Sequence, residues 1–395
     1  MNRFANIIVI LLSCLSISCS DHQKNPDRDT PPEFKAKYVE NILLSEYFEK
    51  MEYVILEECD DGLFMNADRI EYFEDHWYIF DKQLMTVLCF ESDGTFKFRI
   101  HDVGKGPGEY QYPTCMLIHK AKREIWIQCF RSQRLIRYDL EGNFKDDLKV
   151  RAGTDMIQFN DEEVILFDEE YFYFNDKDST YPGLLTLGDN FKRKDQFFEI
   201  QYDILLNVLQ NNRCLSMNND SCYLVYASDS LLSFSQNKKS HVEGVFNFGK
   251  HHLPDELRSL ERRTSNYDFL TESGKVLMKD YLLANSDYFM LTLGLQNEYW
   301  YGIVDRKTND FVVTQGFIND IQSKPFVFPS AKKSENELVG FMSADYTIAL
   351  KESIERLAPD KRGERLEDIL TFANIALEKS GYVLVTLTLK NKNNK

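Results

Sequence analysis

The sequence has few basic residues for its length. Its 395 residues include 47 Lys and Arg against 63 Asp and Glu, which gives a formal net charge of −16. Proteins that bind nucleic acids present a basic footprint to the phosphate backbone. The composition therefore argues against nucleic acid as a main ligand, and it favours a body that is not attracted to anionic surfaces.

The sequence also lacks long apolar runs after residue 18. No later stretch approaches the about 18 uninterrupted apolar residues that a membrane-spanning helix needs. Residues 4–18, FANIIVILLSCLSIS, form an apolar run that is short for a spanning helix and follows the basic Arg3. Such a run is typical of the hydrophobic core of a signal peptide. We therefore predict that residues 1–18 direct export.

The export signal ends in a sequence that resembles a lipobox, the cleavage site of bacterial lipoproteins. Small residues precede Cys19 in Leu15-Ser16-Ile17-Ser18-Cys19. Cys14 is a rival, but cleavage there would shorten the apolar core and leave apolar residues on the mature end. We predict that Cys19 is acylated and holds the protein on the lipid bilayer. Residues 19–35 are polar and rich in Asp and Pro, which predicts a flexible tether.

Several motifs of catalytic and metal sites are missing. No HExxH, CxxC or GxSxG pattern is present, and Gly104–Tyr110 contains neither GxxxxGK[ST] nor GxGxxG. The acidic pairs are adjacent in sequence, so within a strand they would point to opposite faces. We expect no catalytic residues, no metal and no cofactor, and we interpret Gly104–Tyr110 as a structural turn.

Aromatic and apolar residues are abundant, and they are arranged in a repeat. Hydrophobic residues make up 43% of the chain, with 29 Phe and 21 Tyr, a composition that favours strands. Residues 77–96 align without a gap with residues 125–144, at an offset of 48. Both copies contain two apolar strands and then an acid-Gly-x-Phe turn, with Gly94 and Gly142 supplying positive φ. A weaker third copy covers 172–191.

A period near 48 residues with several strands per unit is typical of one propeller blade. We predict an all-β fold for residues 36–395, a six-bladed β-propeller of four-stranded antiparallel blades. Strands are expected at 222–235, 242–249, 288–315 and 325–329. We also expect short helical insertions, one of them starting near Leu253-Pro254, and a C-terminal helix over 363–379 before a closing strand. That strand, Tyr382 to Leu389, is predicted to meet one at 52–56 and so close the ring.

Several segments together resemble the six-bladed β-propeller lipoproteins of Bacteroidetes, a family related to NHL-type propellers. The similar segments share their order and spacing with that family and cover about 36–390: 44–48, 53–57, 104–110, 246–254, 319–326 and 380–389. The sequence departs from it at Cys129, where blades often carry an acid. The resemblance implies the fold and export, and it implies no particular reaction.

Cysteine usage leaves one disulfide to consider. Most of the remaining cysteines lie in apolar strand-like runs, where Cys is a small core residue. Cys214 and Cys222 flank a turn-like sequence, and a hairpin there would bring them roughly opposite each other. Because an exported protein can oxidise its thiols, a disulfide between Cys214 and Cys222 is possible.

We predict that any ligand binds on one particular face of the propeller. The loops between blades and the loops between second and third strands open on the same face, because strand direction alternates. They supply a mixture of aromatic and charged side chains that suits a polar or peptide ligand. The predicted ligand face consists of Asp81, Lys82, Lys105, Glu109, Tyr110, Tyr112, Arg131 and Gln133. The alternative is that Glu109 and Tyr110 only brace neighbouring blades.

These features predict a lipoprotein of the cell envelope, held on the outer membrane with its periplasmic or surface side left open. Ser20-Asp21 is a weak version of the acidic start of surface-export signals. We expect a binding or scaffold propeller without catalytic activity, with a protein, peptide or glycan partner. The alternative is a propeller enzyme, a lyase or hydrolase that acts on glycans or peptides.

Overall fold

The strands of the protein follow its runs of aromatic and β-branched residues. The computed structural model describes residues 30–58, 66–129, 132–150, 153, 155–167, 180–187, 193–201, 215–225, 229–235, 240–254, 273–296 and 298–391. Residues 32–395 form one compact unit, separate from 1–31, and the description below concerns that unit. Cys19 and the predicted tether up to residue 29 lie outside the described residues.

The two clear copies of the repeat form two equivalent antiparallel sheets. The first contains β4 (Arg69–Phe73), β5 (His76–Asp81), β6 (Thr86–Glu91) and β7 (Phe96–Ile100). The second contains β8 (Pro113–His119), β9 (Glu124–Cys129), β10 (Arg134–Asp139) and β11 (Phe144–Lys149). Gly94 and Gly142 have φ of 95° and 84°, which confirms the positive φ predicted for the two hairpins.

A third four-stranded sheet follows. Its strands are β12 (Asp155–Gln158), β13 (Val164–Phe167), β14 (Thr180–Leu187) and β15 (Arg193–Gln201). The predicted strand at 172–175 lies outside the described residues. The second half of this repeat copy, around 184–187, belongs to β14, as expected.

A nine-stranded sheet contains a parallel strand that was not predicted. Its order is β16 (Leu215–Asn218), β17 (Ser221–Val225), β18 (Ser230–Ser235), β19 (Ser240–Asn247), β1 (Glu33–Tyr38), β23 (Phe311–Thr314), β22 (Glu298–Asp305), β21 (Tyr288–Leu295) and β20 (Val276–Ala284). β1 pairs in parallel with β19 and β23, and Phe34 is buried against Gly244, where an added Cβ would meet its ring at 2.2 Å. The folded unit thus begins before residue 36.

The last sheet joins the two ends of the chain. Its order is β25 (Ala331–Lys332), β26 (Glu337–Met342), β27 (Val383–Leu389) and β3 (Phe48–Ile55). β27 is antiparallel to both neighbours, and Leu384 lies opposite Val54. The predicted pairing of the C-terminal strand with 52–56 is confirmed. A short parallel pair consists of β2 (Asn41–Leu43), which precedes β3 in the chain, and β24 (Gly316–Ile318), which follows β23.

Two α-helices lie between β26 and β27: α3 (Ala344–Glu355) and α4 (Glu364–Lys379). The helix predicted over 363–379 is α4, which buries Phe372 and Ala376, whereas α3 was not predicted. α3 begins at Ser343, whose side chain accepts a hydrogen bond from the Tyr346 amide. In the described part of the chain, no helix is both long enough and apolar enough to cross a membrane.

Short 3₁₀ helices complete the described elements: η1 (Leu44–Glu46), η4 (Gly249–His251) and η6 (Pro359–Lys361). A helical insertion was predicted from Leu253-Pro254 onward; η4 ends just before this point, and residues 255–272 lie outside the described residues. Residues 325–329 were expected to form a strand, but they are irregular. The reason is that their aromatic side chains pack on neighbouring sheets instead of alternating across one.

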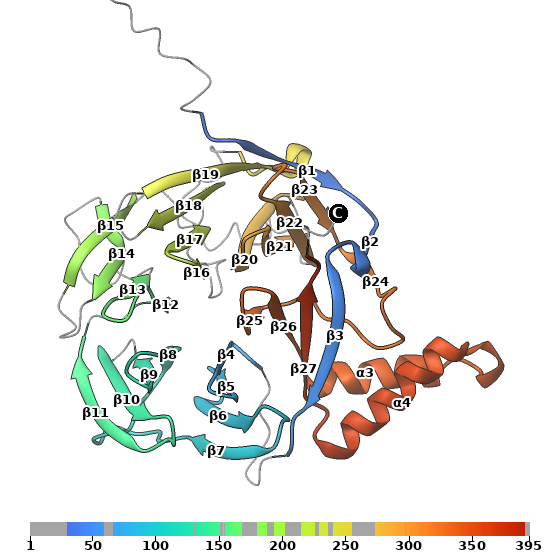
Figure 1. Ribbon diagram of the computed structural model, residues 1–395, viewed down its shortest axis with the longest axis horizontal. Helices are drawn as coiled ribbons and strands as arrows, with labels where there is room; N and C mark the ends of the chain where they lie inside the picture. The colour runs from blue at the N-terminus through green and yellow to red at the C-terminus, as the bar shows by residue number, and fades with distance from the viewer. Residues whose placement is uncertain are drawn as a thin grey trace, which may run out of the picture. The chain divides into compact units, whose positions relative to one another are not determined.

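The sheets form a propeller-like ring (Figure 1). Their innermost strands touch one another in a cycle, in the order β4, β8, β12, β16, β20, β25 and back to β4. The apolar cores lie between neighbouring sheets, as in the cluster that joins Tyr78 and Cys89 to Ile127 and Ile136. Helices α3 and α4 project beside the closing sheet. The all-β prediction is therefore confirmed, with a propeller-like arrangement.

The closing strand should contribute strongly to stability. Leu384 is fully buried in β27, whereas Thr388 of the same strand is partly exposed. Leu384→Ala is expected to lower the free energy of unfolding by about 2–5 kcal/mol, through lost burial and the cavity it leaves. Thr388→Ala should change it by about 0.5 kcal/mol or less. Denaturant unfolding measures both, and equal effects of the two substitutions would contradict a stabilising role for this strand's buried face.

Candidate functional site

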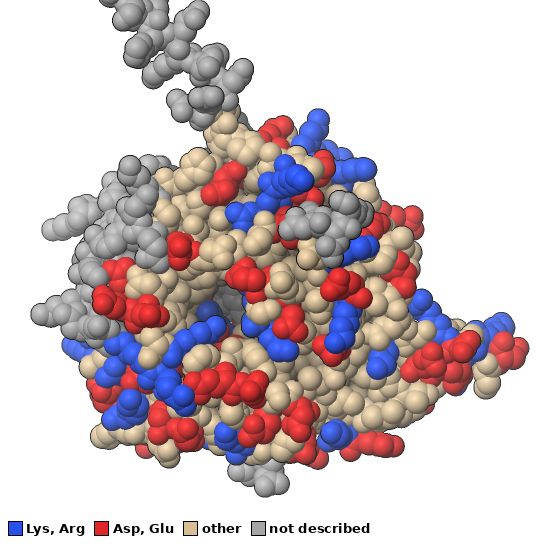
Figure 2. Space-filling view, viewed as in Figure 1, with Lys and Arg blue, Asp and Glu red and all other residues tan. Residues whose placement is uncertain are grey.

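A large cavity lies where the ends of β20–β23, the closing sheet and the segment 319–330 come together. Its volume is about 1770 Å³, and residues next to the first strands of two other sheets, Asn66 and Tyr112, also line it. Its lining is rich in aromatic rings: Tyr112, Tyr281, Tyr299, Tyr301, Phe317, Phe326, Phe328, Phe341 and Tyr346. We call this the aromatic cavity. Figure 2 shows that one face of the ring is hollowed near its centre and has acidic and basic side chains interspersed around the hollow.

Two cavity tyrosines have a left-handed backbone. Tyr112 and Tyr281 have φ of 53° and 52°. Among the described residues, the other non-glycine residues with positive φ lie in turns between consecutive strands. A left-handed conformation costs a residue with a side chain about 1–2 kcal/mol, and such strain clusters at functional sites. Tyr112 directly precedes β8, and Tyr281 lies inside β20.

The conformation of Tyr281 belongs to a bulge in β20. The register with β21 shifts between Asp280 and Leu283, so Tyr281 and Leu282 have no partners in the ladder. Leu282 and Leu283 are both buried, in the cores on opposite faces of the sheet. Bulges re-aim side chains beside functional sites. Here the extra residue lets the two leucines stay in their cores while Tyr281 reaches the aromatic cavity.

One wall of the aromatic cavity is a packed aromatic cluster. The ring centroid of Tyr301 lies 4.5 Å from that of Phe328 and 5.4 Å from that of Phe317, and Phe317 lies 4.8 Å from Phe326. Burial raises the pKa of Tyr301, and the neighbouring Tyr346 and Tyr299 raise it further. The cluster fixes the irregular segment 325–329 in place, so this wall is preformed.

The remaining tyrosines are available at the surface of the aromatic cavity. Tyr112 and Tyr299 are 55% and 59% exposed, and Tyr346 is 43% exposed. Tyr299 lies opposite Gly294 in the ladder of β21 and β22, so no side chain on that partner covers its ring. Exposed rings with apolar faces beside polar neighbours are the groups that anchor ligands.

The charged groups of the lining are largely engaged by the protein itself. Asp68 accepts a hydrogen bond from the Lys82 amide at 2.7 Å. The Lys324 ammonium lies 5.0 Å from the ring centroid of Tyr53 and 5.5 Å from that of Phe372. Arg365 donates a hydrogen bond to the Asn319 carbonyl. Amide and hydroxyl side chains supply most of the other polar groups: Asn66, Gln83, Thr114, Thr292, Gln315 and Ser330.

The innermost strands carry charged residues that bind one another across the ring. Arg69 of β4 donates to Asp155 of β12 at 2.7 Å and to Glu71 at 2.9 Å. The second oxygen of Asp155 accepts from the Leu215 amide of β16. Buried charges are tolerated when they are paired in this way. Asp155 therefore connects three sheets, whereas Glu71 pairs with Arg69 inside β4, and the two carboxylates share one guanidinium.

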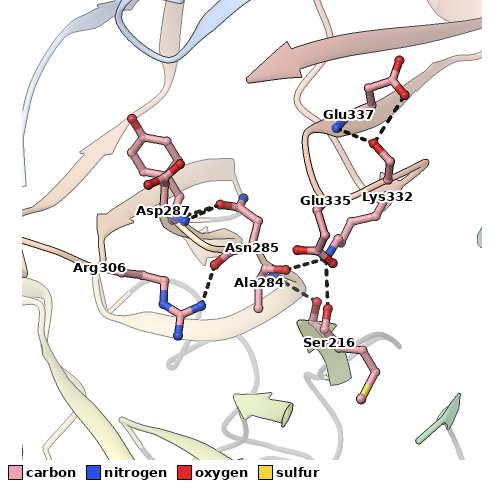
Figure 3. Close-up of polar contacts among 11 residues, drawn as sticks. Ser216, Ala284, Asn285, Asp287, Arg306, Lys332, Glu335 and Glu337 are labelled. Atoms are coloured by element: carbon pink, nitrogen blue, oxygen red, sulfur yellow. Dashed lines mark hydrogen bonds and ion pairs between the residues drawn. The ribbon is translucent and has the colours of Figure 1, made fainter. Parts of the chain in front are cut away.

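Lys332 makes a second polar connection between innermost strands. Its ammonium donates to the carbonyls of Met217 and Ala284 at 3.0 and 2.9 Å and to Glu335 at 2.7 Å (Figure 3). Burial lowers the pKa of Lys332, and the bond to Glu335 opposes that shift. β16, β20 and β25 are thus held together by one side chain. Among the described residues, no group of three His, Cys, Asp or Glu lies as metal ligands would.

The predicted ligand face is divided by the structure. Lys82 and Tyr112 line the aromatic cavity. Asp81 is buried and accepts from the amides of Asn66 and Leu84, so it shapes loops. Gln133 lies in the turn between β9 and β10 with φ of 49°, and Arg131 lies outside the described residues.

The loop at Gly104–Tyr110 is a structural turn between two sheets, as predicted. Tyr110 is buried, and its hydroxyl donates to the carbonyls of Met85 and Ile100. Glu109 accepts from the Gly106 amide, whereas Lys105 is exposed. The alternative that Glu109 and Tyr110 brace neighbouring sheets therefore describes their contacts, and Lys105, Glu109 and Tyr110 do not line the aromatic cavity.

Of the two cysteines in the predicted disulfide, Cys222 is among the described residues. Cys222 is a buried free thiol in β17, and burial raises its pKa. The predicted hairpin forms, but its register places Met217 opposite Cys222. Cys214 lies outside the described residues, so its pairing with Cys222 stays a prediction.

Most of the aromatic cavity was not predicted from the sequence. Tyr281, Tyr299 and Tyr301 lie in strands whose alternation predicted only that they were strands. Phe326 and Phe328 lie in the segment that was expected to be a strand. The signal that was available is the aromatic and proline content of Pro325-Phe326-Val327-Phe328-Pro329, because two prolines disfavour a strand inside a sheet.

Comparison with known proteins finds a matching family model and similar structures for most of the folded unit. The family model described as a domain of unknown function (DUF4934) matches residues 33–374. A protein of Bacteroides fragilis whose name describes it as exported has a similar structure, with a TM-score of 0.71 at 15% identity, over 92% of this chain and 100% of that one. The two chains therefore share a fold. No curated protein sequence matches.

Two further structures show weaker similarity. A member of the DUF4221 family from Bacteroides vulgatus has a TM-score of 0.49 at 9% identity, over 87% of this chain and 97% of that one. BamB from Moraxella catarrhalis has a TM-score of 0.36 at 9% identity, over 70% of this chain and 73% of that one.

The strained backbone at Tyr281 can be tested without a ligand. Tyr281→Gly is expected to be about 1 kcal/mol more stable than Tyr281→Ala, because glycine adopts positive φ without steric cost. At Tyr301, which has an ordinary strand backbone, the order should be reversed by about 0.5–1 kcal/mol. Thermal unfolding of the four variants measures both differences. Alanine as the better residue at both positions would contradict strain at Tyr281.

Proposed function

The chain belongs to the DUF4934 family, and we propose that it is an exported, lipid-anchored binding protein whose ligand occupies the aromatic cavity. The observation that carries this proposal is the cavity itself, which combines a large volume with a preformed aromatic wall and exposed rings. Ligand sites are concave, mostly apolar and supplied with a few polar groups. The partner is a glycan, a peptide or a segment of another protein.

We further propose that the fold is a six-bladed propeller. The cyclic order of the six innermost strands supports it. Each innermost strand is the first of four neighbouring strands in a sheet, as in one blade of a propeller. β1 divides the nine-stranded sheet into β16–β19 and β20–β23, each with the strand order of a blade. In this interpretation β1 joins two blades by pairing with the outer strand of each.

A binding role is favoured over catalysis by the pairing of charges. A propeller lyase or hydrolase acting on glycans or peptides would need acids, bases or metal ligands that face the substrate. Glu71 of β4 and Asp155 of β12 are instead bound to Arg69, and the one acidic group of the described cavity lining, Asp68, accepts from a backbone amide. The exposed groups of the cavity are suited to holding a molecule.

Export and anchoring follow from the N-terminal sequence. The apolar run before Cys19, its small residues and the polar segment behind it support cleavage and acylation there. The structural relative from Bacteroides fragilis is named as exported, which supports the same compartment for this chain. We place the protein in the cell envelope, on the outer membrane, and we do not assign it to the periplasmic or the surface side.

Acylation of Cys19 should hold the protein on membranes. Each buried methylene contributes about 0.8 kcal/mol, so two or three acyl chains anchor a protein durably. Cys19→Ala should release the protein into the soluble fraction or leave it unprocessed, whereas Cys14→Ala should remain in the membrane fraction. Fractionation with mass spectrometry of the mature N-terminus measures this. Wild-type fractionation and processing of Cys19→Ala would contradict the proposal.

Binding in the cavity can be tested with residues of the predicted face that the structure separates. Immobilised protein is screened against soluble oligosaccharides and peptides. Lys82→Ala with Tyr112→Ala should weaken the retained ligand by more than about 1 kcal/mol, because both residues line the aromatic cavity. The control pair Lys105→Ala with Gln133→Ala, outside the cavity, should bind like the wild type. No retained ligand, or equal binding by both pairs, would contradict the proposal.

A further inference from the structure

Three tyrosines of the aromatic cavity come from separate places in two different sheets. Tyr112 precedes the first strand of its sheet, Tyr281 lies in the bulge of β20, and Tyr299 lies at the start of β22. Two of them have the left-handed backbone described above, Tyr112 just before β8 and Tyr281 in the bulge of β20. The chain thus adopts a left-handed backbone at two of the three residues that supply rings to this cavity.

The polar groups beside these rings are mostly uncharged. Asn66, Gln83, Thr292 and Gln315 line the same cavity, and their amides and hydroxyls both donate and accept hydrogen bonds. A sugar hydroxyl also donates and accepts, so it matches such groups. A proline-rich peptide offers mainly carbonyl acceptors, which need donors alone. The described lining has three cationic side chains: Arg365 is bound to a carbonyl, Lys324 lies over two rings, and the Lys82 ammonium can donate to a sugar hydroxyl.

The size of the cavity points to an extended ligand. Pockets for single small molecules have volumes of about 300–1,000 Å³. The aromatic cavity has about 1770 Å³, and its lining comes from four sheets, two helices and the segment 319–330. Several tyrosine rings at separate places in this cavity suit a ligand built as a chain of similar units, each of which has an apolar face and polar edges.

We infer that the aromatic cavity binds a neutral oligosaccharide, with Tyr112, Tyr281 and Tyr299 as stacking platforms for successive sugar rings. This inference rests on the proposed function, because it names the ligand class of the same site. The C–H face of a pyranose packs against an aromatic face, and the hydroxyl groups at its edge meet the amide and hydroxyl side chains. The exposed ring of Tyr299, opposite Gly294, is open for this contact.

Isothermal titration with defined probes tests the inference. The full mature chain is titrated with neutral hexasaccharides of glucose, mannose and xylose, a hexamer of uronic acid and a polyproline peptide. At least one neutral hexasaccharide should bind, and Tyr112→Ala and Tyr299→Ala should each raise its Kd about tenfold. Tyr299→Phe keeps the ring and should retain most of the affinity. Phe144→Ala removes an exposed aromatic outside the cavity lining and should bind like the wild type.

The other outcomes separate two kinds of failure. Binding of the uronic acid hexamer or the polyproline peptide alone, weakened by Tyr112→Ala, would overturn the neutral oligosaccharide and leave a cavity that binds ligands. A neutral hexasaccharide that binds equally to all variants would overturn the stacking platforms. No binding of any probe by folded wild-type protein would overturn the inference, and the screen of the wider library then decides the proposed function. Melting temperatures of all variants identify any loss of folding.

Discussion

Backbone pairing between β27 and β3 is the constraint on which the rest of the structure depends. It brings the last strand of the chain beside a strand near its beginning, and so it closes a ring of sheets that would otherwise expose two long edges. β1 adds a second closure by pairing in parallel with β19 and β23. Both pairings join residues far apart in sequence, so the ring forms as a whole.

The aromatic cavity is a consequence of that closure. Segment 319–330 runs between β24 and the closing sheet, with Phe328 packed on Tyr301 of β22 and Phe326 on Phe317 of β24. β26 contributes Phe341, and the helices between β26 and β27 contribute Tyr346, Arg365 and Ile369. The cavity therefore depends on the closing sheet to hold its walls. Tyr112 and Tyr281 then enter a preformed space at the cost of a strained backbone, a combination that is typical of sites kept for binding.

Local patterns predicted much of the fold. Alternating apolar residues and the Gly94 and Gly142 turns gave two sheets and their hairpins, because the information lies within about twenty residues. α4 and β27 were predictable for the same reason. β1 was not, because its parallel partners are more than 200 residues away and its six residues carry a weak pattern. α3 has a helix start at Ser343 but a mixed apolar pattern, so periodicity did not reveal it.

The site was less predictable than the fold. The direction of the loops placed Lys82 and Tyr112 on one face, and both line the cavity. The same rule selected Tyr110, two residues away, whose hydroxyl is bound to the carbonyls of Met85 and Ile100. Tyr112 lines the cavity with a left-handed backbone, and no local pattern in the sequence distinguishes it from Tyr110. The position of Tyr281 depends on a bulge in β20, which lets Leu282 and Leu283 each remain in its own core.

The central claim is that the aromatic cavity holds the ligand on its tyrosines. A crystal structure of the wild-type protein grown with the neutral oligosaccharide that stabilises it most in thermal unfolding tests this most directly. The account predicts electron density for sugar rings stacked on Tyr112 and Tyr299 between β22 and the start of β8. Sugar bound outside the cavity, with these rings still open to solvent, would contradict it.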